Sequence, residues 1–203
     1  MGPSLPLIVV AWGLVLGAAA VAAPPGLSDG ERQRVASGEV VLLDAMPPGA
    51  GKSARGGTGV GFVRASTEQV WRVIIDYRGH TRFYPRVVGV DVVQADEKHA
   101  LVRYDIAIGP LSFTFHMNKY PDPVRHRTEW HLAPDHANRL FRENSGYWQV
   151  DEAKGGSLVT YAIAVRTIMP SFATFGNERS SIVDTIQGLR KVVEESGGPA
   201  TRP

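Results

Sequence analysis

The sequence of 203 residues contains no cysteine, and this absence excludes several kinds of chemistry at once. Without thiols the chain can form no disulfide bond, no cysteine-based zinc site and no thiol nucleophile. Lipid attachment through a cysteine is excluded for the same reason. A cysteine-free chain is compatible with an oxidising compartment, although it does not require one.

An excess of charge of one sign is also missing. There are 22 Lys and Arg residues against 20 Asp and Glu, a formal net charge of +2, and no dense basic run appears. Nucleic-acid-binding surfaces concentrate positive charge, so we expect no nucleic-acid partner. With 43% hydrophobic and 21% charged residues, the composition is that of one ordinary globular domain with a sizeable core.

Charged side chains are absent from residues 1–23, where the sequence is almost wholly apolar and ends in small residues. Ala20-Val21-Ala22 fits the small-x-small rule for signal cleavage. The run is also long enough to span a bilayer if it is not cut. We therefore expect a signal peptide over 1–23, or an uncleaved anchor formed by residues 5–23. In both cases the folded body is exported, either periplasmic or secreted.

The segment that follows alternates between turn residues and short apolar runs. Residues 24–37 are typical of a linker with a short helix, and the β-branched stretch 38–45 predicts a strand. A glycine-rich stretch, 47–59, predicts an exposed loop, and 60–65 predicts the returning strand. Ser66 then begins a helix, because Gln69 stands three residues later at capping-box spacing.

The remainder of the chain predicts a series of strands and one long helix. The six strands are expected at 87–94, 99–108, 112–120, 125–132, 140–150 and 157–168, separated by Gly and Pro turn signals. After Pro170 the apolar period becomes helical, with a stripe formed by Ile182, Ile186, Leu189 and Val193. Two glycines after residue 196 end this helix. We expect a folded domain over 38–196 and a disordered tail over 197–203.

Turn lengths predict which residues of neighbouring strands face each other. If Ile108 opposes Leu111, Tyr104 opposes Phe115; if Tyr120 opposes Arg125, Phe115 opposes Trp130. Both assumptions place the apolar residues on one face, namely Val102, Tyr104, Ile106, Ile108, Phe113, Phe115, Met117, Trp130 and Leu132. The other face is polar, as in an antiparallel sheet with one covered side.

The aromatic character of the buried face favours an apolar ligand cavity, although the same residues could simply pack against the last helix. The predicted ligand-binding residues are Tyr104, Ile106, Phe113, Phe115, Met117, Thr128, Trp130, Trp148 and Tyr161. Of these, Tyr104, Thr128 and Tyr161 carry hydroxyl groups able to orient a ligand head. Few ionisable groups are expected inside.

Several segments together resemble a known superfamily. They are Val70-Trp71-Arg72-Val73-Ile74-Ile75-Asp76-Tyr77, Phe83-Tyr84-Pro85-Arg86-Val87, Gly109-Pro110, Gly146-Tyr147-Trp148-Gln149-Val150 and Leu158-Val159-Thr160-Tyr161. The chain resembles the START/polyketide-cyclase (SRPBCC, Bet v 1-like) superfamily, and within it the coenzyme Q-binding branch. The resemblance implies an α+β helix-grip fold: an antiparallel β-sheet wrapped around a long C-terminal helix, with two short helices after the first strands. Family members bind quinones, sterols, phospholipids or polyketides, and share no universal catalytic motif.

Motifs for other chemistries fail on spacing. Gly51-Lys52-Ser53 resembles the end of a phosphate-binding loop, but Met46 stands where that motif needs glycine. His126 and His131 are five apart, so on one strand they point to opposite faces and do not converge on a metal. No Gly-x-Ser-x-Gly elbow is present. We expect no catalytic residue, metal or cofactor.

Three functions remain open. The favoured one is a binding protein that carries or sequesters a hydrophobic small molecule or lipid, such as a quinone, sterol, fatty-acyl or polyketide-like compound, with transient membrane contact as a further option. The second is a cyclase- or hydrolase-type enzyme, which needs acid–base groups converging inside the cavity. The third is an envelope protein-interaction module with a filled core, favoured by a cavity much below about 300 Å³. The sequence leaves the oligomeric state open.

Overall fold

Alternating apolar and polar residues build one antiparallel sheet in the structure, a computed structural model that describes residues 26–168 and 178–196. The strands are β1 (Val41–Leu43), β2 (Arg55–Val63), β3 (Val87–Ala95), β4 (Ala100–Ile108), β5 (Leu111–Asp122), β6 (Arg127–Leu132), β7 (Phe141–Ala153) and β8 (Gly156–Thr167). Their order is β1-β2-β8-β7-β6-β5-β4-β3. The segments expected as signal peptide or anchor and as tail lie outside the described residues, as does Pro170.

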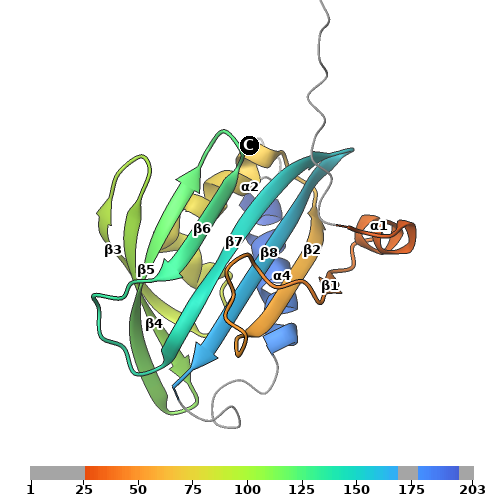
Figure 1. Cartoon of the computed structure of the whole chain (residues 1–203). Helices are drawn as coiled ribbons and strands as arrows, with labels where there is room; N and C mark the ends of the chain where they lie inside the picture. The colour runs from red at the N-terminus through yellow and green to blue at the C-terminus, as the bar shows by residue number, and fades with distance from the viewer. Residues whose placement is uncertain (1–25, 169–177, 197–203) are drawn as a thin grey trace, which may run out of the picture.

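Three of the four helices that the structure describes cover the concave side of this sheet, and the first lies outside it. These four helices are α1 (Asp29–Ala36), α2 (Thr67–Ile75), the 3-10 helix η1 (Tyr77–Arg82) and α4 (Glu178–Ser196). Figure 1 shows α2 and α4 behind the sheet, and α1 outside it, beside β1. The predicted stripe of α4 is buried. The predicted α+β helix-grip fold is therefore confirmed.

Glycine lets α4 approach β2 more closely than other residues would. A Cβ atom on Gly59 would stand 2.5 Å from Cγ2 of Ile182 and 2.8 Å from Cδ1 of Ile186. The expectation of an exposed loop over 47–59 is wrong at its end, because residues 55–59 belong to β2. Glycine is rare in strands, but Gly59 is required here by the helix that packs on it.

The register between β4 and β5 is the predicted one, with Ile108 opposite Leu111 and Tyr104 opposite Phe115. The predicted register between β5 and β6 is wrong by four residues, because Tyr120 opposes Glu129 and not Arg125. The β5 strand continues to Asp122, whose carboxylate accepts hydrogen bonds from the next turn's backbone. A shift of four preserves the side-chain faces, so the predicted apolar face is still the concave one.

Lys119 shares the concave face with Phe115 and Met117, and the corrected register places it directly opposite Trp130. Lys119 is only 4% exposed. The expectation of few ionisable groups inside is thereby corrected at this position, and His80 of η1 is a second such group, with 1% exposure.

A second, smaller apolar cluster closes the outer face near the start of the described chain. Leu27 and Val35, at either end of the α1 segment, pack with Val41 and Val60. The helix begins at a capping box in which Ser28 and Glu31 satisfy each other's backbone N–H groups. Across residues 26–168 and 178–196, no helix has both the length and the apolarity that crossing a membrane requires.

Gly188 provides a test of how tightly α4 is held against η1. A Cβ atom there would stand 2.7 Å from the carbonyl oxygen of Phe83. Helix propensity alone predicts that Gly188→Ala stabilises by about 0.5–1 kcal/mol. The close backbone contact reverses the sign, and we expect a loss of about 1–2 kcal/mol in urea unfolding.

Gly30→Ala is the matched control, because Gly30 is also helical but has open space around it. It should stabilise the protein by about 0.5–1 kcal/mol. Stabilisation by both substitutions would show that α4 does not rest on η1 as described.

Candidate functional site

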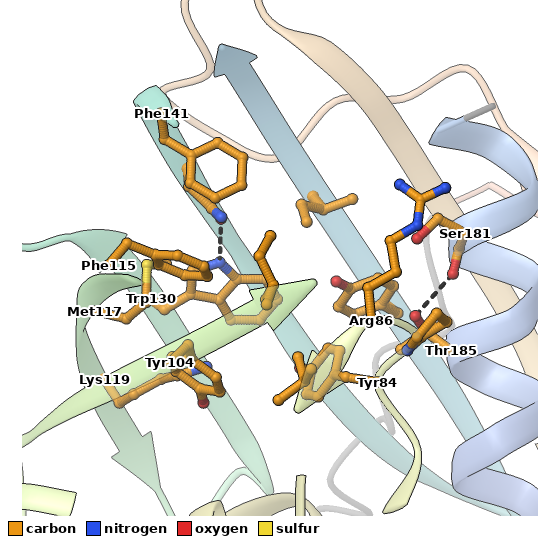
Figure 2. Close-up of a pocket in the computed structure, with 16 residues that line it drawn as sticks. Tyr84, Arg86, Tyr104, Phe115, Met117, Lys119, Trp130, Phe141, Ser181 and Thr185 are labelled. Atoms are coloured by element: carbon orange, nitrogen blue, oxygen red, sulfur yellow. Dashed lines mark hydrogen bonds between the residues drawn. The ribbon is translucent and has the colours of Figure 1, made fainter. Parts of the chain in front are cut away.

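A cavity of about 120 Å³ lies between the concave face of the sheet and α4. It is lined by Tyr84, Pro85, Arg86, Val87, Tyr104, Ile106, Phe115, Met117, Lys119, Trp130, Phe141, Asn144, Tyr161, Ile163, Ser181 and Thr185 (Figure 2). Aromatic and aliphatic side chains form most of the wall, and no Asp or Glu is among these lining residues. Such a wall suits an apolar ligand with few polar groups.

Six of the nine predicted binding residues line this cavity: Tyr104, Ile106, Phe115, Met117, Trp130 and Tyr161. Phe113, Thr128 and Trp148 do not. Trp148 lies behind the wall, where its Nε1 donates to the Tyr84 hydroxyl at 2.6 Å and its ring stands 4.3 Å from that of Tyr161. Thr128 is buried elsewhere on β6, and Phe113 is half-buried near the start of β5.

Sequence periodicity missed the lining residues that lie outside the strands. Tyr84, Pro85 and Arg86 belong to the connection between η1 and β3, where no alternation indicates which side chains point inward. The resemblance had marked this segment, but not as part of the site. Arg86 adopts a positive φ of 71°, which is uncommon for a residue with a side chain. Figure 2 shows Arg86 at the side of the cavity where Ser181 and Thr185 project from α4.

Aromatic contacts hold the sheet side of the cavity in place. The Trp130 ring stacks on Tyr161 at 5.7 Å, and Tyr104 stacks on Phe115 at 5.6 Å. Trp130 Nε1 also donates a hydrogen bond to Oδ1 of Asn144 at 3.2 Å, drawn in Figure 2. A buried indole whose N–H is satisfied has one preferred position, so this wall is preorganised.

His80 fixes the hydroxyl of Tyr104 from behind. Its Nε2 lies 2.8 Å from the carbonyl oxygen of Ile74 and therefore donates, which leaves Nδ1 to accept from the Tyr104 hydroxyl at 2.8 Å. Burial, reinforced by the positive charge of Lys119, lowers the pKa of His80 to about 3. The ring is therefore neutral at ordinary pH.

Lys119 places an amine against three aromatic faces. Its Nζ lies 4.6 Å from the ring centroid of Trp130, 5.3 Å from that of Tyr104 and 5.9 Å from that of Tyr77. Cation–π attraction partly compensates the ammonium for lost water. Burial nevertheless lowers the pKa of Lys119 to about 7. The side chain thus presents both ammonium and free amine to the cavity near neutral pH.

The possible metal ligands of the described chain are its His, Asp and Glu residues. Within the part of the chain that the structure describes, no three His, Asp or Glu side chains gather in a way that could hold a metal ion. His116 and His136 do stack, at 4.2 Å between ring centroids, but without a third ligand. The chemistry that this cavity offers is apolar contact, hydroxyl and amide hydrogen bonding, the guanidinium of Arg86 and the amine of Lys119.

Several solved structures have the same fold as this chain. The Zhui aromatase/cyclase from Streptomyces sp. R1128 superposes with a TM-score of 0.61 at 15% identity, covering 74% of this chain and 99% of that one. A STAR-related lipid transfer protein from Xanthomonas axonopodis gives 0.59 at 13% identity, covering 76% and 98%. A START superfamily protein from Mycobacterium smegmatis gives 0.54 at 15% identity, covering 68% and 97%.

Of two sequence comparisons, one found a match that agrees with the fold. No curated protein matches the chain. A family model does match, over residues 63–180, more than half of the sequence, and its description is polyketide cyclase/dehydrase and lipid transport. That range contains the sheet from the end of β2 to β8 and most of the residues that line the cavity. The chain therefore belongs to the polyketide cyclase/dehydrase and lipid-transport family.

Proposed function

We propose that this protein binds a hydrophobic small molecule or lipid by enclosing an apolar ring or head of that molecule between the sheet and α4. The observation that carries the proposal is the aromatic cavity, which the family and the fold associate with hydrophobic ligands. An apolar cavity of about 150 Å³ is known to bind benzene. The volume of about 120 Å³ therefore suits one small ring or a branched head, not a whole sterol.

The contacts define how such a ligand would be oriented. Phe115, Met117 and Trp130 provide apolar surface, whose burial contributes roughly 25 cal/mol per Å². At the α4 side, Arg86 and Ser181 offer hydrogen-bond donors to a polar substituent. We propose that the ring enters against the sheet and that any polar group faces α4.

The test is to measure, by titration calorimetry, the binding of toluene, which is a ring-sized apolar compound. The expected Kd is about 0.1–1 mM, in keeping with so few atoms. Ser181→Phe projects a ring from α4 into the cavity and should weaken binding at least tenfold. Ser181→Ala removes the hydroxyl without filling the space and should bind as the unmodified protein does. Equal binding by the Phe and Ala variants would place toluene elsewhere.

One observation favours a second function. The cavity is smaller than the roughly 300 Å³ of ordinary ligand pockets, which is what an interaction module with a filled core would show. The two functions differ in the toluene experiment, because a filled core takes up no ring. Failure of toluene and of larger apolar probes to bind would favour the interaction module.

We further propose that the folded body works outside the cytoplasm. The support is the uncharged, apolar sequence of residues 1–23 with its small-x-small site. The mass of the mature protein, isolated from an envelope fraction, tests this. A chain that starts near Ala23 supports a cleaved signal, and a full-length chain in the cytosol contradicts export.

A further inference from the structure

The amine of Lys119 contributes nothing to the binding of an apolar ligand, and it is buried among aromatic rings. It projects from β5 into the cavity, opposite Trp130, and meets aromatic rings on its other sides. Among the described residues no carboxylate lies within ion-pair distance of its Nζ, and none lines the cavity. Buried lysines are normally paired, so the partner of this one is to be sought in the ligand.

Two ligand groups would suit an amine in this position. A carboxylate would pair with the ammonium form, and a carbonyl carbon would react with the free amine. Burial without a neighbouring anion favours the free amine, and it brings the pKa of Lys119 to about 7. Roughly half of the molecules then carry the free amine at pH 7, against fewer than about one in a thousand for an exposed lysine. An amine desolvated in an apolar pocket is the activated form of a lysine nucleophile.

We infer that Lys119 forms a reversible imine with the carbonyl group of an apolar aldehyde or ketone held in the cavity. The inference rests on the proposed binding function. The lone pair of Nζ attacks the carbonyl carbon, and the C=O electron pair moves to oxygen, which takes up a proton. Nitrogen then loses its protons as the C=N bond forms, and the carbonyl oxygen leaves as water. The balance is one amine and one carbonyl to one imine and one water, without oxidant or reductant.

The groups around the amine are compatible with this step. The titratable and charged side chains that face it or share its cavity are Tyr77 and His80 from η1, Tyr84 and Arg86 from the η1–β3 connection, Tyr104 from β4 and Tyr161 from β8. Burial raises the pKa values of all four tyrosines, so they are neutral near pH 7. None supplies a negative charge that would hold Lys119 as the ammonium. A carbonyl group between the rings of Tyr104 and Trp130 meets the amine directly.

The test is reductive trapping of the purified protein with benzaldehyde and sodium cyanoborohydride at pH 7, followed by peptide mapping. Cyanoborohydride delivers hydride to the imine carbon and leaves a stable benzyl amine. We expect one benzyl group on Lys119, at least tenfold faster than on an exposed lysine such as Lys154. The rate at Lys119 relative to that at Lys154 should fall as pH rises above about 7, because the free amine of Lys119 is then fully formed while that of Lys154 still increases.

Lys119→Met and Lys119→Arg control for site and fold. Both should lose the fast labelling, and cooperative urea unfolding of Lys119→Met shows that its fold is intact. Toluene binding without preferential labelling of Lys119 would overturn the imine and leave the proposed function standing. Saturable binding of benzoate with no adduct from benzaldehyde would likewise overturn it, in favour of a carboxylate ligand. Failure of toluene to bind would overturn both.

Discussion

Replacement of Lys119 by methionine is expected to stabilise the folded protein by about 3 kcal/mol at pH 7. The interval between the ordinary lysine pKa of 10.5 and the value of about 7 corresponds to roughly 5 kcal/mol of unfavourable ionisation. Loss of the cation–π contacts with Trp130 and Tyr104 offsets about 1–2 kcal/mol of the gain. Methionine keeps the length and flexibility of the apolar stem, so little packing is lost.

The pH dependence of this difference identifies its cause. Between pH 7 and about pH 10 the unfolded chain binds a proton at Lys119 that the folded protein has lost, so the wild-type protein gains stability as pH rises. The advantage of the Met variant should therefore shrink toward pH 10 and stay constant below pH 7. Urea unfolding at several pH values measures both trends. Lys154→Met, at an exposed position, should change stability by less than about 0.5 kcal/mol.

A destabilising effect of Lys119→Met, or a difference that does not vary with pH, would contradict this account of the buried amine. The expected result also bears on function. A cavity residue that lowers the free energy of unfolding by several kcal/mol is typical of a site where the side chain acts on a ligand.

Acidification is expected to remove about 4 kcal/mol of stability through His80 alone. The folded pKa of about 3 lies below the ordinary value of 6.5, because the ring is buried and near Lys119. Between these values the unfolded chain binds a proton that the folded protein excludes. The contribution is therefore fully present above pH 6.5 and is lost as pH falls toward 3, at about 1.4 kcal/mol per pH unit.

His80→Gln isolates this effect from other titrating groups. Glutamine offers one donor and one acceptor, for the carbonyl of Ile74 and the hydroxyl of Tyr104, but does not titrate. We expect the variant to be about 1–2 kcal/mol less stable at pH 7 and less sensitive to acid, so that the two proteins become equally stable near pH 5. Parallel loss of stability in both proteins down to pH 3 would show that His80 is not the group responsible.

Strand alternation predicted the fold and most of the sheet side of the cavity. The β4–β5 register follows from a two-residue turn, which leaves one way to pair the strands. The β5–β6 register was predicted wrongly, because the four-residue loop lies two residues further along the chain, after Asp122, and alternation alone cannot detect a shift of an even number of residues. Lys119 was missed for a different reason: alternation places it on the apolar face after Met117, but its charge is typical of the outer face.

The lining residues on the α4 side of the cavity could not be predicted from the periodicity of the sequence. The helical stripe identifies which residues of α4 are buried, but not how far α4 stands from the sheet. That distance depends on contacts such as Gly59 against Ile182, which join residues far apart in the sequence. The connection containing Tyr84 and Arg86 has no period at all, and only its resemblance to a family segment indicated that it mattered.

Native mass spectrometry with lipid extraction, on protein purified from the cells that make it, tests the central claim most directly. We expect a lipophilic molecule carrying a ring or compact head to copurify in a one-to-one complex, and to be lost from Ser181→Phe but kept by Ser181→Ala. Protein that arrives empty, and that also takes up no toluene, quinone, sterol or fatty-acyl probe, would contradict the claim that this cavity holds a hydrophobic ligand.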